Sequence, residues 1–169
     1  MIEDFKTELS TAILSIDNDK IIQARKLFRK ASRIVFIGNG GSAAIASHMA
    51  IDYTKNAGKE AISFNDASAL TCVANDYGYV NVFSKQIEWH CKPTDVLVAI
   101  SSSGKSQNIL NGVYAAQGLS MPIITLSGFE KYNPLSCEGS VNFYVPSMDY
   151  GVVEITHLSI LHSLIGKLE

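Results

Sequence analysis

The stretch Arg33–Lys55, RIVFIGNGGSAAIASHMAIDYTK, decides the fold predicted for this chain. It opens with Ile34–Ile37, a short apolar run typical of a strand buried on both faces. Gly38–Gly41 then allows a sharp reversal and brings bare backbone N–H groups close to a ligand. Ser42 is a favourable N-cap for a following helix. Together they predict an anion pocket, because the first helical N–H groups lack partners and the helix dipole favours negative charge.

The helix that follows carries two ionisable side chains among mostly apolar neighbours. His48 and Asp52 are four residues apart and therefore lie on one face of the helix. As a plain surface pair they would stabilise the helix by only about 0.2–0.5 kcal/mol. Polar groups on a mostly buried helix near an anion pocket favour a functional role instead.

The rest of the chain alternates strands of the buried type with helices. Residues 2–31 show helical periodicity in two segments that are separated by Asp17–Asp19. Further strands are expected at Ala61–Phe64, Val96–Ile100, Ile123–Leu126 and Val141–Val145. Helices are expected at Ala67–Ala74, Val80–His90, Gln107–Gln117 and Gly151–Leu168, with a short one near Pro134. This order predicts an α/β fold with a five-stranded parallel sheet, in one domain made of N-terminal helices (1–31) and an α/β core (32–169).

Composition and charge restrict the classes of function. The chain has 169 residues, 47% hydrophobic and 18% charged, which is ordinary globular composition. A net charge of −2 without a basic run argues against a nucleic-acid partner. No apolar run approaches the roughly 18–20 residues that span a bilayer, so no membrane association is expected. Three cysteines without metal-type spacing and an N-terminus unlike a secretory signal predict reduced thiols in a cytoplasmic protein.

A second polar loop, Ser101–Ser106 (SSSGKS), follows the third expected strand and precedes a helix. Its four hydroxyls and free N–H groups suit a phosphate, whereas the alternative is a polar loop with a capping serine. A nucleotide P-loop would need glycine at position 99, where Ala99 stands, so a nucleoside triphosphate is disfavoured. In an open α/β sheet, ligands bind at the carboxyl ends of strands where the strand order reverses. We therefore expect one site between the first and third strands.

The glycine turn also satisfies the dinucleotide pattern G-x-G-x-x-A over Gly38–Ala43. In that scheme an acidic residue about 20 positions further on would hold the ribose. Asp66 is the candidate, but it lies 28 residues after Gly38. Because the serine-rich loop would also have no task, NAD is disfavoured.

The last expected helix carries Glu154, His157 and His162 in an otherwise apolar sequence. Burying several ionisable groups without partners is costly, which favours a functional role. Glu154 and His162 are eight residues apart, about 12 Å along an ideal helix. They could reach one point from the frayed start of the helix or from different subunits, and the sequence leaves this open.

The segment Asn75–Tyr79 has the composition of a turn. Asn75 and Asp76 either only form this turn or also offer hydrogen bonds to sugar hydroxyls.

These motifs together resemble the sugar isomerase (SIS) domain family, and within it the phosphoheptose isomerases. The resemblance runs from about residue 30 to the C-terminus. It depends on four motifs in register: Gly38–Ser42, Ala74–Gly78, Ile100–Ser106 and the closing Glu154, His157 and His162. It implies a flavodoxin-like three-layer sandwich, a homotetramer and active sites at subunit interfaces.

The resemblance also implies an activity, the isomerisation of sedoheptulose 7-phosphate to D-glycero-D-manno-heptose 7-phosphate through an enediol, with Asp52 and His162 as catalytic residues. The phosphate-binding residues would be Ser101, Ser102, Ser103 and Ser106. The residues around the sugar would be Asn39, Gly40, Gly41, Ser42, Asn75 and Asp76. A zinc ion would be held by His48, Asp52, Glu154 and His162.

Three positions depart from the family pattern. Asp52 stands where glutamate is usual, Glu154 where glutamine is usual, and Lys105 where asparagine is common. Two alternatives therefore stay open: a phosphosugar-binding module without catalysis, and an isomerase of a different sugar phosphate.

Overall fold

A five-stranded, all-parallel sheet forms the centre of the structure, a computed structural model that describes residues 1–165. The strands lie in the order β2-β1-β3-β4-β5. Their bounds are Ile34–Gly38 (β1), Ala61–Ser63 (β2), Val96–Ser101 (β3), Ile123–Ser127 (β4) and Val141–Tyr144 (β5). The predicted sheet is confirmed, and each strand ends within one residue of its expected limit. Because β1 pairs with both β2 and β3, the strand order reverses between β1 and β3 as predicted.

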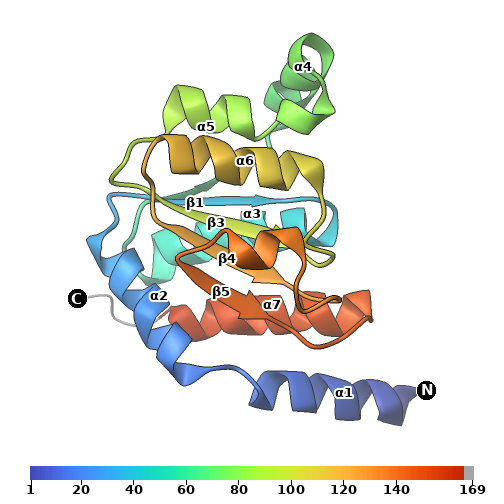
Figure 1. Cartoon of the computed structure of the whole chain (residues 1–169). Coiled ribbons are helices and arrows are strands. Elements are labelled where there is room, and N and C mark those ends of the chain that lie inside the picture. The colour runs from blue at the N-terminus through green and yellow to red at the C-terminus, as the bar shows by residue number, and fades with distance from the viewer. Residues whose placement is uncertain (166–169) are drawn as a thin grey trace.

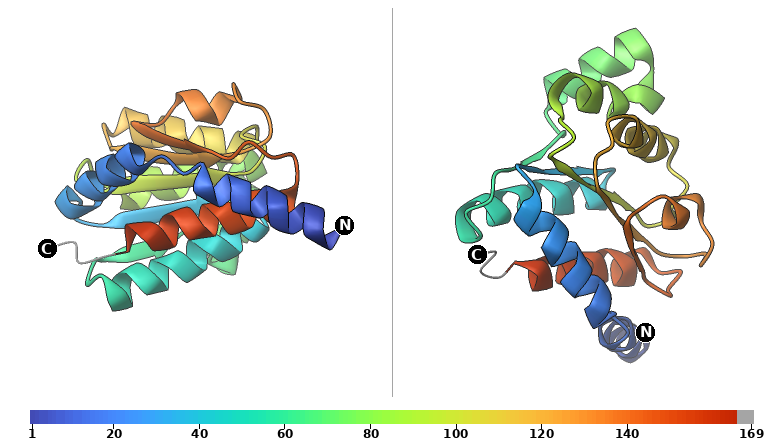
Figure 2. Two further views of the ribbon diagram at one scale, coloured as in Figure 1. Left: turned by 90° about the horizontal axis from the view of Figure 1, so that it is seen from below. Right: turned by 60° about the vertical axis from the view of Figure 1, so that its left-hand side comes forward.

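Helices cover both faces of the sheet and complete the predicted three-layer sandwich (Figure 1). One face carries α2 (Asn18–Lys30), α3 (Gly41–Asn56) and α7 (Tyr150–Leu164), with α1 (Ile2–Leu14) packed on α7. The other face carries α5 (Ser84–His90), α6 (Gln107–Gly118) and the 3₁₀ helix η2 (Pro134–Cys137). The helix α4 (Ala67–Tyr77) and the 3₁₀ helix η1 (Tyr79–Asn81) follow β2, and α4 lies at the periphery (Figure 2).

The strands are apolar at every position because alternate side chains enter two different cores. In β1, Ile34 and Phe36 pack with Phe28 of α2 and Tyr53 of α3. Val35 and its alternate neighbours face the layer of α5 and α6. This double burial is the reason why a continuous apolar run, rather than an alternating one, predicts the strand.

Two predictions about local structure need correction. The single helix expected over Val80–His90 is divided into η1 and α5, because the Asn81 side chain donates to the Tyr77 carbonyl (2.7 Å) and the Ser84 hydroxyl donates to the Asn81 carbonyl (3.2 Å). The turn expected over Asn75–Tyr79 begins inside α4, which ends at Tyr77 and is followed by Gly78 with φ +81°. Glycine takes this positive φ without steric cost, so the helix extends further than its composition suggests.

The ends of other helices follow the sequence more closely. The break expected near Asp17 is confirmed, since its side chain accepts hydrogen bonds from the N–H groups of Asp19 and Lys20 and caps α2. The last helix was expected to reach Leu168, but α7 ends at Leu164 and positions 166–168 lie outside the described residues. Within residues 1–165, no helix combines the length and the apolar character that a membrane crossing requires.

Candidate functional site

The carboxyl ends of β1 and β3 open into a cleft of about 250 Å³. It lies where the sequence predicts it, between the glycine turn and the serine-rich loop. Its lining residues are Asn39, Gly40, Gly41, Ser42, Ile100, Ser101, Ser102, Ser103, Ser106, Tyr150 and Glu154. Eight of the ten residues that the family resemblance assigned to the substrate therefore line one cavity.

The glycine turn starts α3 earlier than expected. Ser42 was predicted as the N-cap, but Gly40 occupies that position with φ +53°, a left-handed conformation that glycine adopts without strain. Ser42 is instead the second residue of α3, buried and facing the cleft. Its hydroxyl is thereby free to act on a ligand rather than on its own helix.

Two of the helices that begin at the cleft, α3 and α6, lack side-chain caps. The helices α2, α4 and α7 are each capped by an aspartate, namely Asp17, Asp66 and Asp149. In contrast, α3 and α6 have Gly40 and Ser106 at the N-cap and no side-chain cap hydrogen bond. Uncapped N-termini direct positive partial charge and spare N–H donors into the cleft, which favours an anion.

The serine loop adds buried hydroxyls to these donors. Ser101 and Ser102 are 5% and 6% exposed, and the Ser101 hydroxyl donates to the Ser106 hydroxyl at 3.3 Å. The Ser102 hydroxyl is buried and finds no partner among the described residues. An unpaired buried hydroxyl is costly, and an oxygen-rich ligand in the cleft would satisfy it.

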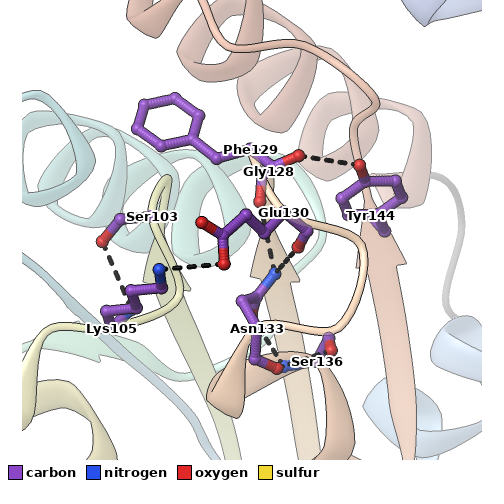
Figure 3. Close-up of polar contacts among 8 residues, drawn as sticks. All are labelled: Ser103, Lys105, Gly128, Phe129, Glu130, Asn133, Ser136 and Tyr144. Atoms are coloured by element: carbon purple, nitrogen blue, oxygen red, sulfur yellow. Dashed lines mark hydrogen bonds and ion pairs between the residues drawn. The ribbon is translucent and has the colours of Figure 1, made fainter.

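The loop between β4 and η2 supports the serine loop from outside (Figure 3). Asn133 is fully buried and donates to the carbonyls of Gly128 (3.2 Å) and Glu130 (2.7 Å). The Lys105 ammonium lies 2.9 Å from a Glu130 carboxylate oxygen. The positive charge that the sequence places beside the phosphate loop is therefore paired with this carboxylate, and Lys105 does not line the cleft.

A second group of side chains joins α3 to the last helix. His48 Nε2 lies 3.5 Å from Asp52 Oδ2, and His162 Nδ1 lies 3.7 Å from the same oxygen. The two imidazole Nε2 atoms are 3.4 Å apart. A single chain thus brings Asp52 and His162 together, and all three side chains remain partly exposed to a ligand.

These three residues fit a metal ion by their chemistry. Each offers one donor atom, and the donors lie within 4.8 Å of one another. Two ligands at about 2.0–2.1 Å from a tetrahedral zinc ion lie about 3.3 Å apart, close to the 3.5 Å between His48 Nε2 and Asp52 Oδ2. Imidazole and carboxylate are common zinc ligands, and three protein ligands leave a position open for substrate.

Glu154, the fourth expected ligand, lies elsewhere. It lines the cleft, and a Cβ added to Gly41 would lie 2.5 Å from its Oε1 atom, so its carboxylate rests against the first turn of α3. The reason is helix geometry, because Glu154 and His162 are eight positions apart in α7 and therefore about 12 Å apart along its axis. Within one chain, Glu154 does not join His48, Asp52 and His162, so its role as a metal ligand stays a prediction.

His157 does not belong to either group. It is fully buried, and its Nε2 atom lies 3.1 Å from the Ser127 carbonyl at the end of β4. Burial lowers the pKa of His157 to about 4, because a charged imidazolium would lose its hydration. This histidine is a neutral core residue that ties α7 to the sheet.

Asn75 and Asp76 lie outside the cleft. Both are exposed in the last turn of α4, where Asn75 Nδ2 donates to Asp76 Oδ1 at 2.8 Å. Their expected contact with the sugar stays a prediction. Asp66, the candidate for a ribose contact, instead accepts a hydrogen bond from Ala69 N–H and caps α4.

Sequence reasoning missed three residues near the cleft. Tyr150 lines the rim and packs edge-on against Phe129, with ring centroids 4.8 Å apart. Asn108 and Tyr79 both hydrogen-bond to Asn39. A polar residue in the first turn of an apolar helix is the only signal that could have indicated Asn108.

The comparisons with known proteins agree with this geometry. The family model of the SIS domain matches residues 4–128. A phosphoheptose isomerase from Helicobacter pylori (strain HPAG1) is 40% identical over 81% of this chain and 74% of its own length. One from Histophilus somni (strain 2336) is 34% identical over 99% of this chain and 95% of its own. The solved structure of a phosphoheptose isomerase from Neisseria gonorrhoeae has a TM-score of 0.88 and 30% identity, with 97% of this chain and 92% of that chain covered.

Proposed function

The chain belongs to the SIS domain family, and from this membership and the cleft geometry we propose that it is an aldose–ketose isomerase of a sugar phosphate. Sedoheptulose 7-phosphate is the proposed substrate, since the relatives quoted above are named phosphoheptose isomerases. The observation that carries the proposal is the approach of His48, Asp52 and His162 beside a cleft built for an anion. A module that only bound phosphosugars would need the serine loop but not this group.

The phosphate is proposed to bind between the serine loop and the open starts of α3 and α6. The hydroxyls of Ser101, Ser102, Ser103 and Ser106 would donate to its oxygens, and the helix N-termini would supply the field. Because the phosphate is remote from the reacting carbons, its binding energy orients them for reaction.

Isomerisation requires the transfer of one proton between two carbons and of one between two oxygens. The Asp52 carboxylate removes a proton from C1 of the ketose and returns it to C2, which forms and then consumes an enediol. His162 takes the O1 proton and delivers one to O2, so that the carbonyl moves from C2 to C1. Positioned acid–base groups typically contribute about 10²–10⁴-fold each.

We propose that a zinc ion is held by His48, Asp52 and His162. When bound, it would polarise the substrate carbonyl and stabilise the negative charge that develops on the enediolate. The donor set and donor spacing described above support zinc over a hard cation such as Mg²⁺, which prefers oxygen ligands in octahedral geometry.

We also propose a homotetramer with sites at its subunit interfaces. Ile51, beside Asp52, is 66% exposed, and Ile155, beside Glu154, is 41% exposed. Apolar side chains this exposed next to site residues are expected where another subunit covers them. Light scattering during size-exclusion chromatography tests this assembly. A cytoplasmic location is proposed as well, because all three cysteines are free thiols.

The test is to incubate the purified, zinc-loaded protein with sedoheptulose 7-phosphate in D₂O and to follow the sugars by NMR. We expect an aldose with deuterium at C2, because the Asp52 carboxyl exchanges its proton with solvent. Asp52→Asn and His162→Asn should each lower kcat by at least about 100-fold. His90→Asn, which changes an exposed histidine in the opposite helical layer, is the matched control and should leave kcat unchanged.

No turnover by the wild-type protein, with binding retained in Asp52→Asn and His162→Asn, would show a binding module instead. Turnover of a different sugar phosphate but not of the heptose would keep the isomerase and remove the proposed substrate.

A further inference from the structure

We propose that Asn108 is a positioning residue that sets the orientation of the Asn39 carboxamide in the cleft. Asn108 lies in the first turn of α6, is 4% exposed and does not line the cleft. Asn39 follows β1 and does line it. The inference uses the proposed function only for the identity of the substrate.

The two carboxamides exchange a reciprocal pair of hydrogen bonds. Asn39 Nδ2 donates to Asn108 Oδ1, and Asn108 Nδ2 donates to Asn39 Oδ1, both at 2.9 Å. The Tyr79 hydroxyl also donates to Asn39 Oδ1, at 3.2 Å. Both lone pairs of that oxygen are therefore engaged.

The direction of this pair is determined by the backbone of α6. The Ile109 N–H is shared between the Ser106 carbonyl (3.1 Å) and Asn108 Oδ1 (3.0 Å), which favours an oxygen rather than an NH₂ group at that position of the carboxamide. Its nitrogen then faces Asn39, and a flipped Asn39 would place two N–H groups against each other. The Tyr79 hydroxyl can donate or accept, so it follows the orientation that Asn108 imposes and donates here to the Asn39 oxygen.

The orientation of the Asn39 carboxamide decides which hydrogen-bonding group faces a ligand in the cleft. With its oxygen engaged and one N–H bonded, Asn39 offers its second N–H to the cleft and acts there as a donor. A donor beside the serine loop suits a carbonyl or hydroxyl oxygen of the sugar. Asn108 therefore links the start of α6, where the phosphate is proposed to bind, to the glycine turn that meets the sugar.

Two variants of Asn108 isolate this effect. Asn108→Asp keeps an oxygen for the Ile109 N–H but cannot donate to Asn39, whereas Asn108→Ala removes both bonds. The matched control is Asn142→Ala, because Asn142 Nδ2 donates to Thr125 Oγ1 at 2.7 Å in the sheet, away from the cleft lining. Tyr79→Phe removes only the third bond.

We expect Asn108→Asp and Asn108→Ala to lower kcat/KM for sedoheptulose 7-phosphate about tenfold, mainly through KM. In Asn108→Ala, which adds no charge beside the phosphate, the inhibition constant of inorganic phosphate should change less than twofold, because phosphate needs only the serine loop. Tyr79→Phe should show a smaller loss of the same kind, and Asn142→Ala should change neither quantity. A merely structural role at the start of α6 would be served by aspartate as well as by asparagine, so an unaffected Asn108→Asp variant would overturn the inference.

The Asn39 side-chain amide gives a readout that is independent of turnover. In the ¹⁵N spectrum of the wild-type protein, one of its two protons should exchange slowly with solvent and the other rapidly, and Asn108→Ala, which removes the acceptor of the bonded proton, should abolish this difference. If the wild-type protein isomerised no sugar, the proposed function would fail, while these signals would still decide the inference. Equal exchange of both protons in the wild-type protein would refute it.

Discussion

Gly104→Ala tests how the serine loop is held, and its cost can be worked out from the structure. Gly104 has φ +64°, which an alanine adopts at a cost of about 1–2 kcal/mol. A Cβ atom there would lie 2.8 Å from Asn133 Cβ and closer still to the Asn133 carboxamide. Asn133 cannot move aside easily, because it is fully buried and donates to two carbonyls of the neighbouring loop (Figure 3). Overpacking of this kind costs about 1–3 kcal/mol, so the total is roughly 2–5 kcal/mol.

Gly58→Ala is the matched control for the backbone term. Gly58 has φ +61°, but nothing lies within 4 Å of a Cβ added to it. The entropy that an alanine removes from the unfolded chain is the same in both variants and cancels in the comparison. Gly58→Ala should therefore cost only the backbone term, about 1–2 kcal/mol.

The assay is urea unfolding at one fixed protein concentration, since association would shift the transition. Gly104→Ala should lower the free energy of unfolding by at least about 1 kcal/mol more than Gly58→Ala does. It should also weaken the binding of inorganic phosphate, because the serine loop has to move, whereas Gly58→Ala should not. Equal destabilisation by the two variants would refute the reasoning that Asn133 holds this loop from outside.

Three further predictions concern charge, protons and metal. Glu154→Gln removes a unit charge from a cleft of about 250 Å³. A sphere of that size is about 8 Å across, and at this distance the Glu154 charge repels a phosphate dianion by about 1 kcal/mol even in water. Inorganic phosphate should therefore bind about fivefold more tightly to Glu154→Gln than to the wild-type protein, and an unchanged affinity would contradict this. The pKa of His157 is lowered from 6.5 to about 4 in the folded protein, so its contribution to stability is present above about pH 6.5 and is lost as pH falls towards 4. Urea unfolding at several pH values should show that this histidine lowers the free energy of unfolding by roughly 3 kcal/mol in total between pH 6.5 and pH 4. His157→Gln should remove this part of the pH dependence. Dialysis against a chelator should abolish isomerisation, and zinc should restore it, except in His48→Ala; full activity of the metal-free protein would exclude the proposed zinc site.

Much of the fold follows from local patterns. The apolar runs at Ile34–Ile37 and Val96–Ile100 predict β1 and β3 because both of their faces are buried, which makes the pattern continuous. The break before α2 follows from Asp17, whose side chain caps the helix. The division of Val80–His90 into η1 and α5 could not be predicted, because it depends on side-chain bonds of Asn81 that compete with the helix.

The candidate site also has parts that the sequence predicts and parts that it does not. The serine loop and the glycine turn are predictable, because hydroxyl and glycine residues directly after a buried strand have a limited set of roles. The distance between Glu154 and His162 follows from helix geometry alone. Helix geometry does not predict that Glu154 lines the cleft or that His162 lies beside Asp52. His157 shares the helix and the residue type of His162, and only its burial against the Ser127 carbonyl distinguishes the two.

The sequence by itself determined the parallel sheet, the place of the cleft and the residue types that line it, because periodicity and turn chemistry act over a few neighbouring residues. The tertiary structure decided that His48 and His162, 114 residues apart, meet at Asp52 while Glu154 faces the cleft. It also decided that Asn108 acts on Asn39. Contacts between side chains from distant parts of the chain depend on how closely the helices pack on the sheet and on each other. No local sequence pattern encodes these interhelical distances.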